Sequence, residues 1–227
     1  MVIKKTCPLG RGRRAVDEPT KERRRRDLLT AALRLLERQP YETITMSAVA
    51  AAADVAKGTT YLYFPTREAL FLALLAEHYA AWFDALDTCL REGPASAEAW
   101  AAWVAAELSG RPMFLRLAAL LHVVLEANVP VAEVVAFKRS LAGRLAASGA
   151  GLEAALELPP GCGVRLLLWL QAVVPGLAQM AAPAPELHQA LRGDAMLAGL
   201  LIDFPNELRA LLGALIRGLE AAKEPTP

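Results

Sequence analysis

Residues Thr45–Phe64 read TMSAVAAAADVAKGTTYLYF, and this stretch decides the fold of the N-terminal part of the chain. The small and apolar residues up to Ala53 predict a short helix, and the hydroxyl of Thr45 can cap its first turn. Asp54 stands at a tight turn, because Asp tolerates a left-handed backbone better than most residues. A second short helix follows, with polar side chains where a buried helix needs Leu or Val. Two short helices joined in this way form a helix-turn-helix, whose second helix fits the DNA major groove.

The second of these helices presents groups that suit a DNA surface. Threonine hydroxyls can reach base edges or phosphates, and threonine methyls can contact thymine. The lysine and the amphipathic tyrosines can hold phosphates. The predicted DNA contacts are Thr45, Lys57, Thr59, Thr60, Tyr61, Tyr63 and Arg67. Aromatic residues near a helix end also occur in ordinary cores, so the residues of this segment leave that alternative open.

The flanking residues favour the DNA-binding interpretation. Upstream, a stripe of Leu and Ala with helical spacing follows a basic run at residues 21–26. Downstream, Pro65 stops one helix and Thr66 can cap the next, in which Glu68 complements the helix dipole. A basic-ended helix, a helix-turn-helix and a capped fourth helix together form a compact DNA-binding unit.

Residues from about 24 to 75 resemble the DNA-binding domain of the tetracycline-repressor (TetR) family of bacterial transcription regulators. The matching landmarks are LTAA at 29–32, YETIT at 41–45, VA at 49–50, ADV at 53–55, KGTTYLYF at 57–64 and REAL at 67–70. The family usually has Gly where Asp54 stands and Ser where Ala56 stands. We therefore expect a weakly capped recognition helix in this chain. The resemblance implies a dimer that binds a palindromic operator, and a small-molecule effector held in a C-terminal helical domain.

Charge is divided unevenly along the chain. Residues 1–67 hold 14 Lys and Arg against 7 Asp and Glu, whereas residues 68–227 hold 11 against 17. The net charge of +1 therefore hides a basic N-terminal part, as expected where only one end meets a polyanion. Residues 1–19 are basic and lack apolar periodicity, which predicts a disordered arm and no secretion signal. Whether this arm follows the DNA or hangs free is left open.

The rest of the chain divides into helices at its Pro and Gly residues, and no sustained two-residue alternation predicts a sheet. We expect helices at about 67–91, 96–108, 112–127, 131–147, 164–180, 186–191 and 206–222. The fourth of these extends to about residue 158 after a break at Gly149 and Gly151. The predicted fold is all-α, with a basic arm at 1–19, a three-helix helix-turn-helix domain at 20–66 and a larger ligand-binding and dimerisation domain at 67–227.

Two late helices are too apolar for the surface of a monomer. The run at 164–180 approaches the length of a membrane span, but Gln171, Pro175 and Gln179 interrupt it, which argues against a membrane. The family resemblance implies another use, because such regulators pair two late helices from each subunit in a four-helix interface. The predicted homodimer contacts are Leu167, Leu170, Val174, Leu212, Ile216 and Leu219.

An effector site is expected among the central helices. These helices combine bulky aromatics with many Ala residues, a mixture that can leave a void, and two polar residues four apart share one helix face. The predicted lining residues are Trp82, Trp103, Phe114, His122, Glu126, Phe137 and Trp169. The effector is expected to be small and largely apolar. The alternatives are that the aromatics form ordinary core and that the His–Glu pair lies on the surface.

These patterns together predict a cytoplasmic, ligand-responsive transcription regulator, in the first instance a repressor, that binds double-stranded DNA as a homodimer. The three cysteines at 7, 89 and 162 and the three histidines are scattered, and no metal motif, phosphate-binding glycine loop or nucleophile elbow occurs. We therefore predict no catalytic activity, metal or cofactor. The alternative function is a constitutive or architectural DNA-binding protein without an effector.

Overall fold

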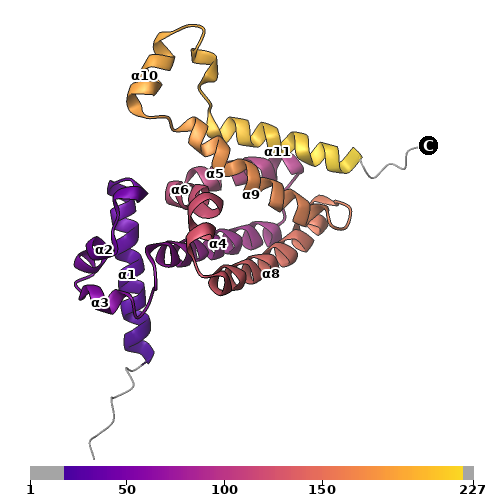
Figure 1. Cartoon of the computed structure of the whole chain (residues 1–227). Helices are drawn as coiled ribbons and strands as arrows, with labels where there is room; N and C mark the ends of the chain where they lie inside the picture. Colours follow the sequence, from indigo (N-terminus) through magenta and orange to yellow (C-terminus); the bar gives the residue numbers. More distant parts are fainter. Residues whose placement is uncertain (1–17, 222–227) are drawn as a thin grey trace, which may run out of the picture.

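The computed structural model describes residues 18–221, and every regular element within this range is a helix. Figure 1 shows a small group of helices, α1–α3, beside a larger helical body through which α4 runs. The elements are α1 (Glu18–Arg38), η1 (Tyr41–Thr43), α2 (Met46–Ala52), α3 (Lys57–Thr60), α4 (Arg67–Glu92), α5 (Ala97–Ser109), α6 (Pro112–Leu120), η2 (Leu121–Leu125), α7 (Glu126–Asn128), α8 (Val131–Leu156), α9 (Cys162–Ala181), α10 (Pro185–Gly193), η3 (Ala198–Leu200) and α11 (Phe204–Ala221). The all-α prediction is confirmed. The predicted basic arm lies, up to residue 17, outside the described residues.

The N-terminal helices pack around the apolar stripe that the sequence indicated. Leu28 and Ile44 are fully buried where α1 meets α2 and α4. Thr45 caps α2, since its hydroxyl accepts from the backbone N–H of Ala48 at 3.1 Å. Asp54 has the left-handed conformation predicted for the turn, with φ at 53°. The helix-turn-helix therefore has the local geometry that its residues predict.

The second helix of the motif is shorter than expected. α3 covers only Lys57–Thr60, and the chain then passes through a turn before Phe64. Ala56 stands at the N-cap without a side-chain hydrogen bond, which confirms the weak cap expected there. The aromatic side chains after Thr60 are therefore presented from a turn and not from a continuing helix.

α4 is the helix around which the larger body is built. The hydroxyl of Thr66 caps it by accepting from the backbone N–H of Ala69 at 3.0 Å, as predicted. α8 packs along α4, α9 packs along α8, and α11 packs on α5 and α9. Between α4 and α8, the buried hydroxyl of Ser148 donates to Asp87 Oδ1 at 2.5 Å. Arg144 on α8 pairs with Asp84 at 2.8 Å, so polar contacts help to fix how these two helices lie.

The break predicted near Gly149 is absent, because α8 runs without interruption over Val131–Leu156. Gly149 serves close packing instead. A Cβ at this position would lie 2.7 Å from Cγ2 and 2.8 Å from the backbone N of Val164 on α9. Gly163 faces Gly149 from α9 and has no room for a side chain either. The two glycines therefore let the backbones of α8 and α9 approach each other closely.

Two helices, α4 and α9, are long and apolar enough to cross a membrane by length and composition, and α5 with α6–α7 forms a bent pair that passes the same criterion. Within the apolar window of α4, 56% of the residues are buried inside the protein, compared with 22% for α9. The apolar residues of α4 are therefore mainly core. α9 retains an apolar surface that a single chain does not cover.

The α8–α9 contact leads to a stability prediction. Gly149→Ala should lower the free energy of unfolding by about 1–3 kcal/mol, because an added methyl group must push Val164 away. Gly143→Ala is the matched control in the same helix, since its Cβ meets no atom within 4 Å. This control should stabilise the protein by up to about 1 kcal/mol. Urea unfolding followed by circular dichroism measures both, and equal effects would contradict the close packing.

Candidate DNA-binding surface and ligand cavity

The α3 helix and the turn after it form one exposed surface at the N-terminal end of the molecule. Lys57 is exposed on α3, Tyr61 is 47% exposed, and Thr59 and Tyr63 are partly exposed. These four predicted DNA contacts share this surface. Thr45 is also exposed, at the start of α2, with its hydroxyl engaged in the cap.

Thr60 does not belong to this surface, contrary to the prediction. Its side chain is fully buried, and its hydroxyl donates to the carbonyl of Lys57 at 2.7 Å. The helix positions Thr59 outward, so its neighbour one residue later necessarily points to a different side. Thr60 therefore stabilises the recognition helix from within, and its hydroxyl is not presented to DNA.

Arg67 has a structural role besides the predicted one. Its Nη1 donates to the carbonyls of Tyr41, Glu42 and Ile44 at 3.3, 3.4 and 2.9 Å. Its Nε and Nη2 donate to Glu68 Oε1 at 3.0 and 2.9 Å. The guanidinium also lies over the ring of Tyr41, 4.3 Å from its centroid. These contacts tie Arg67 into the DNA-binding domain, and its predicted phosphate contact stays a prediction.

Glu68 completes this cluster at the start of α4. Burial raises the pKa of Glu68, but hydrogen bonds from its own backbone N–H, Arg67 and Tyr41 outweigh burial and hold the pKa below its ordinary value. The Tyr41 hydroxyl donates to Glu68 Oε1 at 3.0 Å. Burial, together with the neighbouring Glu68 charge, raises the pKa of Tyr41. The carboxylate therefore stays charged and the phenol stays neutral at physiological pH.

Three exposed residues join the surface although they were absent from the predicted contacts. Leu62 is 80% exposed in the turn after α3, where an apolar side chain has no core to fill. Arg23 and Arg24 on α1 border an open hollow together with Thr59. The basic run in the sequence pointed toward the two arginines. No sequence signal marked Leu62, because a leucine in a helical pattern is normally taken as core.

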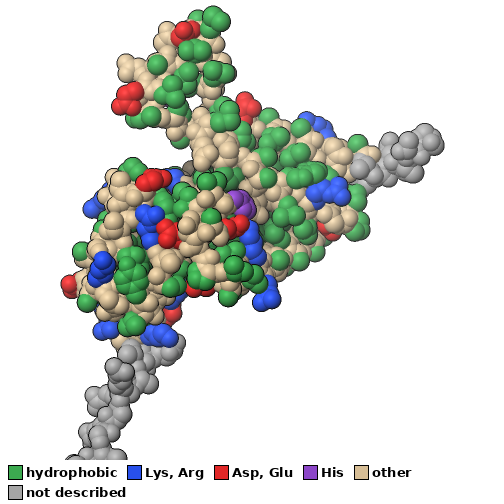
Figure 2. All heavy atoms as spheres, viewed as in Figure 1, with side chains coloured by type: hydrophobic (Ala, Val, Ile, Leu, Met, Phe, Trp, Pro, Cys, Tyr) green, Lys and Arg blue, Asp and Glu red, His purple; other side chains and the backbone are tan. Residues whose placement is uncertain are grey.

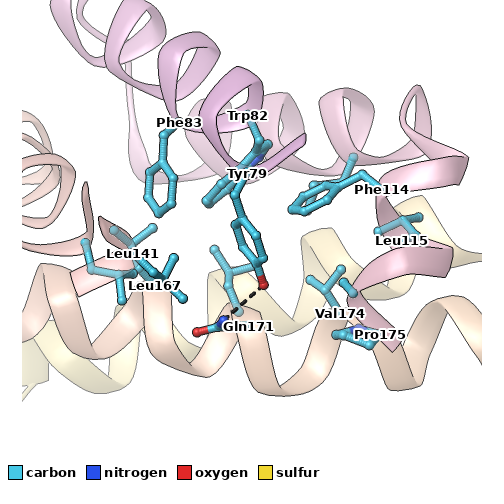
Figure 3. Close-up of a pocket in the computed structure, with 14 residues that line it drawn as sticks. Tyr79, Trp82, Phe83, Phe114, Leu115, Leu141, Leu167, Gln171, Val174 and Pro175 are labelled. Atoms are coloured by element: carbon cyan, nitrogen blue, oxygen red, sulfur yellow. Dashed lines mark hydrogen bonds between the residues drawn. The ribbon is translucent and has the colours of Figure 1, made fainter. Parts of the chain in front are cut away.

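The larger body has a narrow, partly open cavity of about 30 Å³ between α4, α6, α8 and α9. Figure 3 shows the aromatic rings of Tyr79, Trp82, Phe83 and Phe114 on one side and aliphatic side chains of α8 and α9 opposite. The Nε2 of Gln171 donates to the Tyr79 hydroxyl at 3.0 Å across the cavity. Burial raises the pKa of Tyr79 to about 12, so the hydroxyl remains protonated.

One residue that lines the cavity has a buried polar group without a partner. Trp82 Nε1 is buried, and among residues 18–221 it has no hydrogen-bond partner. A buried donor without an acceptor is unfavourable by about 1–3 kcal/mol. Tyr79 and Gln171 give the otherwise apolar cavity a few polar groups, which is the usual chemistry of a small-molecule site.

The predicted ligand residues are only partly gathered here. Trp82 and Phe114 line the cavity. Phe137 borders a neighbouring hollow with Tyr79 and Phe83, while Trp103 and Trp169 pack, partly buried, against the core elsewhere. In the sequence, Gln171 stands out only because it interrupts an apolar run. A polar residue within an apolar helical run was the sequence feature that could have indicated this polar group of the cavity.

The predicted polar pair of the site lies elsewhere. His122 has a side chain that is 61% exposed, and its Nδ1 lies 3.2 Å from Glu126. Lys138 also pairs with Glu126. Burial raises the pKa of Glu126, but its bonds to Lys138 and His122 outweigh burial and lower the pKa. The pair is therefore part of a surface ion cluster and does not line the cavity.

The predicted dimer contacts face the interior of a single chain. All six residues are buried, with exposed fractions between 0 and 6%. α5 and α8 cover this side of α11 and α9, so these side chains cannot reach a second copy. The outward side of α9 carries Leu168, Ala172 and Gly176 instead, and that of α11 carries Ala214 and Gly218. The apolar stripes on which the predicted contacts lie therefore face the core.

The exposed recognition surface on a helix-turn-helix, attached to a helical body with its own cavity, defines a DNA-binding regulator of the helix-turn-helix class. The description "Bacterial regulatory proteins, tetR family" matches residues 28–74, and "Tetracyclin repressor-like, C-terminal domain" matches residues 76–223. Because the matches extend over both parts, the chain belongs to the TetR family of bacterial transcription regulators.

Individual relatives are more distant. The chain is 48% identical to the HTH-type transcriptional repressor KstR of Rhodococcus jostii over 59 residues, which are 26% of this chain and 27% of that protein. It is 36% identical to the HTH-type transcriptional regulator EthR of Mycobacterium tuberculosis over 95 residues, 42% of this chain and 43% of that protein. The chain thus spans less than half the length of these curated relatives.

A solved structure supports the fold over nearly the whole chain. The FadR repressor of Thermus thermophilus in complex with lauroyl-CoA superposes with a TM-score of 0.54 at 22% identity. The superposition covers 89% of this chain and 98% of that one. At this level of identity the comparison establishes the shared architecture alone.

The Arg67 cluster leads to a second prediction. Arg67→Ala should lower the free energy of unfolding by about 1–3 kcal/mol, because three carbonyls and Glu68 lose a charged donor. Arg34→Ala, at an exposed position on α1, is the control and should change stability by less than about 0.5 kcal/mol. Thermal unfolding checks both. If Arg67→Ala weakens DNA binding without any loss of stability, the predicted contact of Arg67 with a phosphate is supported.

Proposed function

We propose that this protein is a cytoplasmic, ligand-responsive transcriptional repressor that binds a palindromic operator as a homodimer. In this proposal residues 20–66 bind DNA, and residues 67–227 bind the effector and the second copy. The observation that carries it is the exposed surface of α3 and the following turn, held on a well-packed three-helix unit. The family membership supports it, as does the similarity to the repressor KstR and the regulator EthR.

The residues of the proposed DNA-binding surface divide into those that suit phosphates and those that suit bases. Lys57, Tyr61 and Tyr63 supply a charge and two hydroxyls for phosphates, which position the protein on the duplex. Thr59 and Leu62 lie on the same surface and suit base edges and thymine methyl groups. In a two-fold dimer the two recognition helices then lie about 34–36 Å apart, one turn of the duplex.

The proposed dimer forms through the outward sides of α9 and α11. These sides carry Leu168 at 47% exposure and several small residues, among them Gly176 and Gly218, whose missing Cβ atoms would meet nothing within 4 Å in a single chain. Glycine inside a helix costs about 0.5–1 kcal/mol, so some gain must offset it. Close approach of a second helix supplies that gain.

The proposed effector is a small, largely apolar molecule with a hydrogen-bond acceptor. Four aromatic rings favour an apolar or aromatic body, and Trp82 offers an unused N–H donor. A cavity of about 30 Å³ has room for roughly one water, so α4, α6, α8 and α9 must separate when a molecule of useful size enters.

Two helices connect this cavity to the DNA-binding domain. α4 contributes Tyr79 to the cavity and carries Arg67 at its N-terminal end. α6 contributes Leu115 to the cavity, while the next residue, Arg116, donates from Nη1 to the carbonyl of Leu36 at the end of α1 at 2.5 Å. A molecule that separates the cavity helices therefore disturbs both attachments. An effector with different affinities for the two arrangements changes the affinity for DNA.

The small cavity also favours a second candidate function, a DNA-binding protein without an effector. Helices that remain closed around about 30 Å³ form an ordinary core with one packing defect. In that case the aromatic cluster contributes only to stability. The response of DNA binding to added compounds distinguishes the two functions.

The DNA contacts give a third prediction. Tyr63→Ala should weaken operator binding by about 1–3 kcal/mol. Lys57→Ala should weaken binding to all sequences and reduce the salt slope, the slope of log binding constant against log salt concentration, by about one. Lys138→Ala in the larger body is the control and should leave the slope unchanged. Gel-shift titrations at several salt concentrations, on a duplex selected from random DNA, measure all three. If Lys57→Ala keeps the wild-type salt slope, Lys57 does not contact a phosphate and the proposed DNA-binding surface is contradicted.

The cavity gives a fourth prediction. In a panel of small apolar carbonyl compounds, tested beside lauroyl-CoA as a larger, charged acyl thioester, at least one compound should release the operator and quench tryptophan fluorescence. Ala118→Val fills the cavity and should weaken that compound's effect at least about tenfold, since a methylene group in a filled site is worth about 1–3 kcal/mol. Ala119→Val, the next residue outside the cavity lining, is the control. If no compound acts and Ala118→Val only stabilises the protein, the second candidate function replaces the first.

A further inference from the structure

An arm at residues 185–200, comprising α10, η3 and the turn between them, projects from the body of the protein. Figure 1 shows the arm leaving the body between the end of α9 and the start of α11, at the end far from α3. No residue of α10 or η3 is buried. The helices of the arm pack mainly on each other and have few contacts with the body. The arm therefore has almost no core of its own.

The arm carries large apolar side chains in spite of this exposure. Leu187 is 52% exposed, Met196 is 90% exposed and Leu200 is 61% exposed. Figure 2 shows hydrophobic side chains both on the arm and on the adjoining part of the body. A nine-residue helix such as α10 is marginal in water without tertiary packing. Its apolar side chains need a partner surface to bury against.

The position of the arm indicates which partner this is. Both ends of the arm join α9 and α11, the two helices whose outward sides form the proposed dimer face. Small residues such as Ala172, Gly176 and Ala214 allow close approach on that face but contribute little area each. A stable interface buries about 800 Å² on each partner. Besides Leu168 and Met180 on α9 itself, the larger side chains of the arm supply further apolar area next to that face.

The charge of the arm fits a protein partner and not a polyanion. It carries Glu186 and Asp194 against a single Arg192, whereas the basic run at residues 21–26 lies on α1, far from the arm in Figure 1. We infer that each arm lies across a second copy of this chain and buries its apolar side chains there. The contact is reciprocal in a two-fold dimer, so each interface contains two arms. This inference rests on the proposed dimer.

Sedimentation of the full chain across a range of concentrations tests the inference. Leu187→Asp and Leu200→Asp should each raise the dimer dissociation constant at least about tenfold, the order expected of an interface residue that matters. Gln189→Asp adds the same charge to exposed α10 and should change the constant less than about twofold. Thermal unfolding of the monomeric fraction should be unchanged, because neither leucine is buried in a single chain.

A crosslink identifies the surface on which the arm lies. Met196→p-benzoylphenylalanine, irradiated in the full-length protein, should give a product of dimer mass on a denaturing gel, with mixed isotopically labelled copies confirming a bond between chains. A stable dimer with crosslinks only within one chain, or one unaffected by both aspartates, overturns the role of the arm. A wild-type chain that remains monomeric with the operator overturns the proposed dimer as well.

Discussion

The guanidinium of Arg67 joins the helix-turn-helix to the larger body, because it spans three backbone carbonyls before α2 from the first turn of α4. Those carbonyls belong to η1 and its end, where the chain enters the DNA-binding motif. Glu68 and the Tyr41 ring hold the guanidinium from its other sides. The direction of the recognition surface relative to α4 therefore depends on a charged cluster with little freedom. A planar donor with five N–H groups suits this position in a way that lysine cannot.

Arg116 makes a second attachment of the same kind, from α6 to the carbonyls of Leu36 and Gln39 at the end of α1. The adjoining residue Leu115 lines the cavity, so a single turn of α6 touches both the interior and the DNA-binding domain. α6 continues into a π-helical segment, η2 (Leu121–Leu125), and such segments often occur at functional sites. The proposed effector response has a physical route through these two arginines, and both can be varied without altering the cavity lining.

α9 and α11 each have apolar residues on two sides, one that packs against the core and one that is exposed in the single chain. On α9, Leu167 and Leu170 face the core, whereas Leu168 and the small residues in line with it face outward. α11 repeats the arrangement, with Ile216 buried against α5 and Ala214 exposed. Apolar residues on two sides of a helix need cover on both sides, and on α11 the exposed side also carries Arg209 and Arg217. The single chain covers one side, and the proposed second copy with its arm covers the other.

The sequence by itself determined the helix-turn-helix, since its signals are local. The hydroxyls of Thr45 and Thr66 each accept from the backbone N–H three residues later, and Asp54 forms its turn with immediate neighbours. The family resemblance and the all-α fold followed from the same short patterns. Element boundaries were less accurate where packing overrides local preference, as at Gly149, whose small size serves α9 and not a helix break.

Only the tertiary structure decided which side of each helix packs against the core and which side remains exposed. Helical periodicity located the apolar stripe of α9, but whether the core or a second copy covers that stripe depends on where α8 and α11 lie. Arg67 bonds to carbonyls up to 26 residues away, and Gln171 reaches Tyr79 across 92 residues of sequence. Such partners leave no local pattern, because distance along the chain carries no information about proximity once the helices have packed.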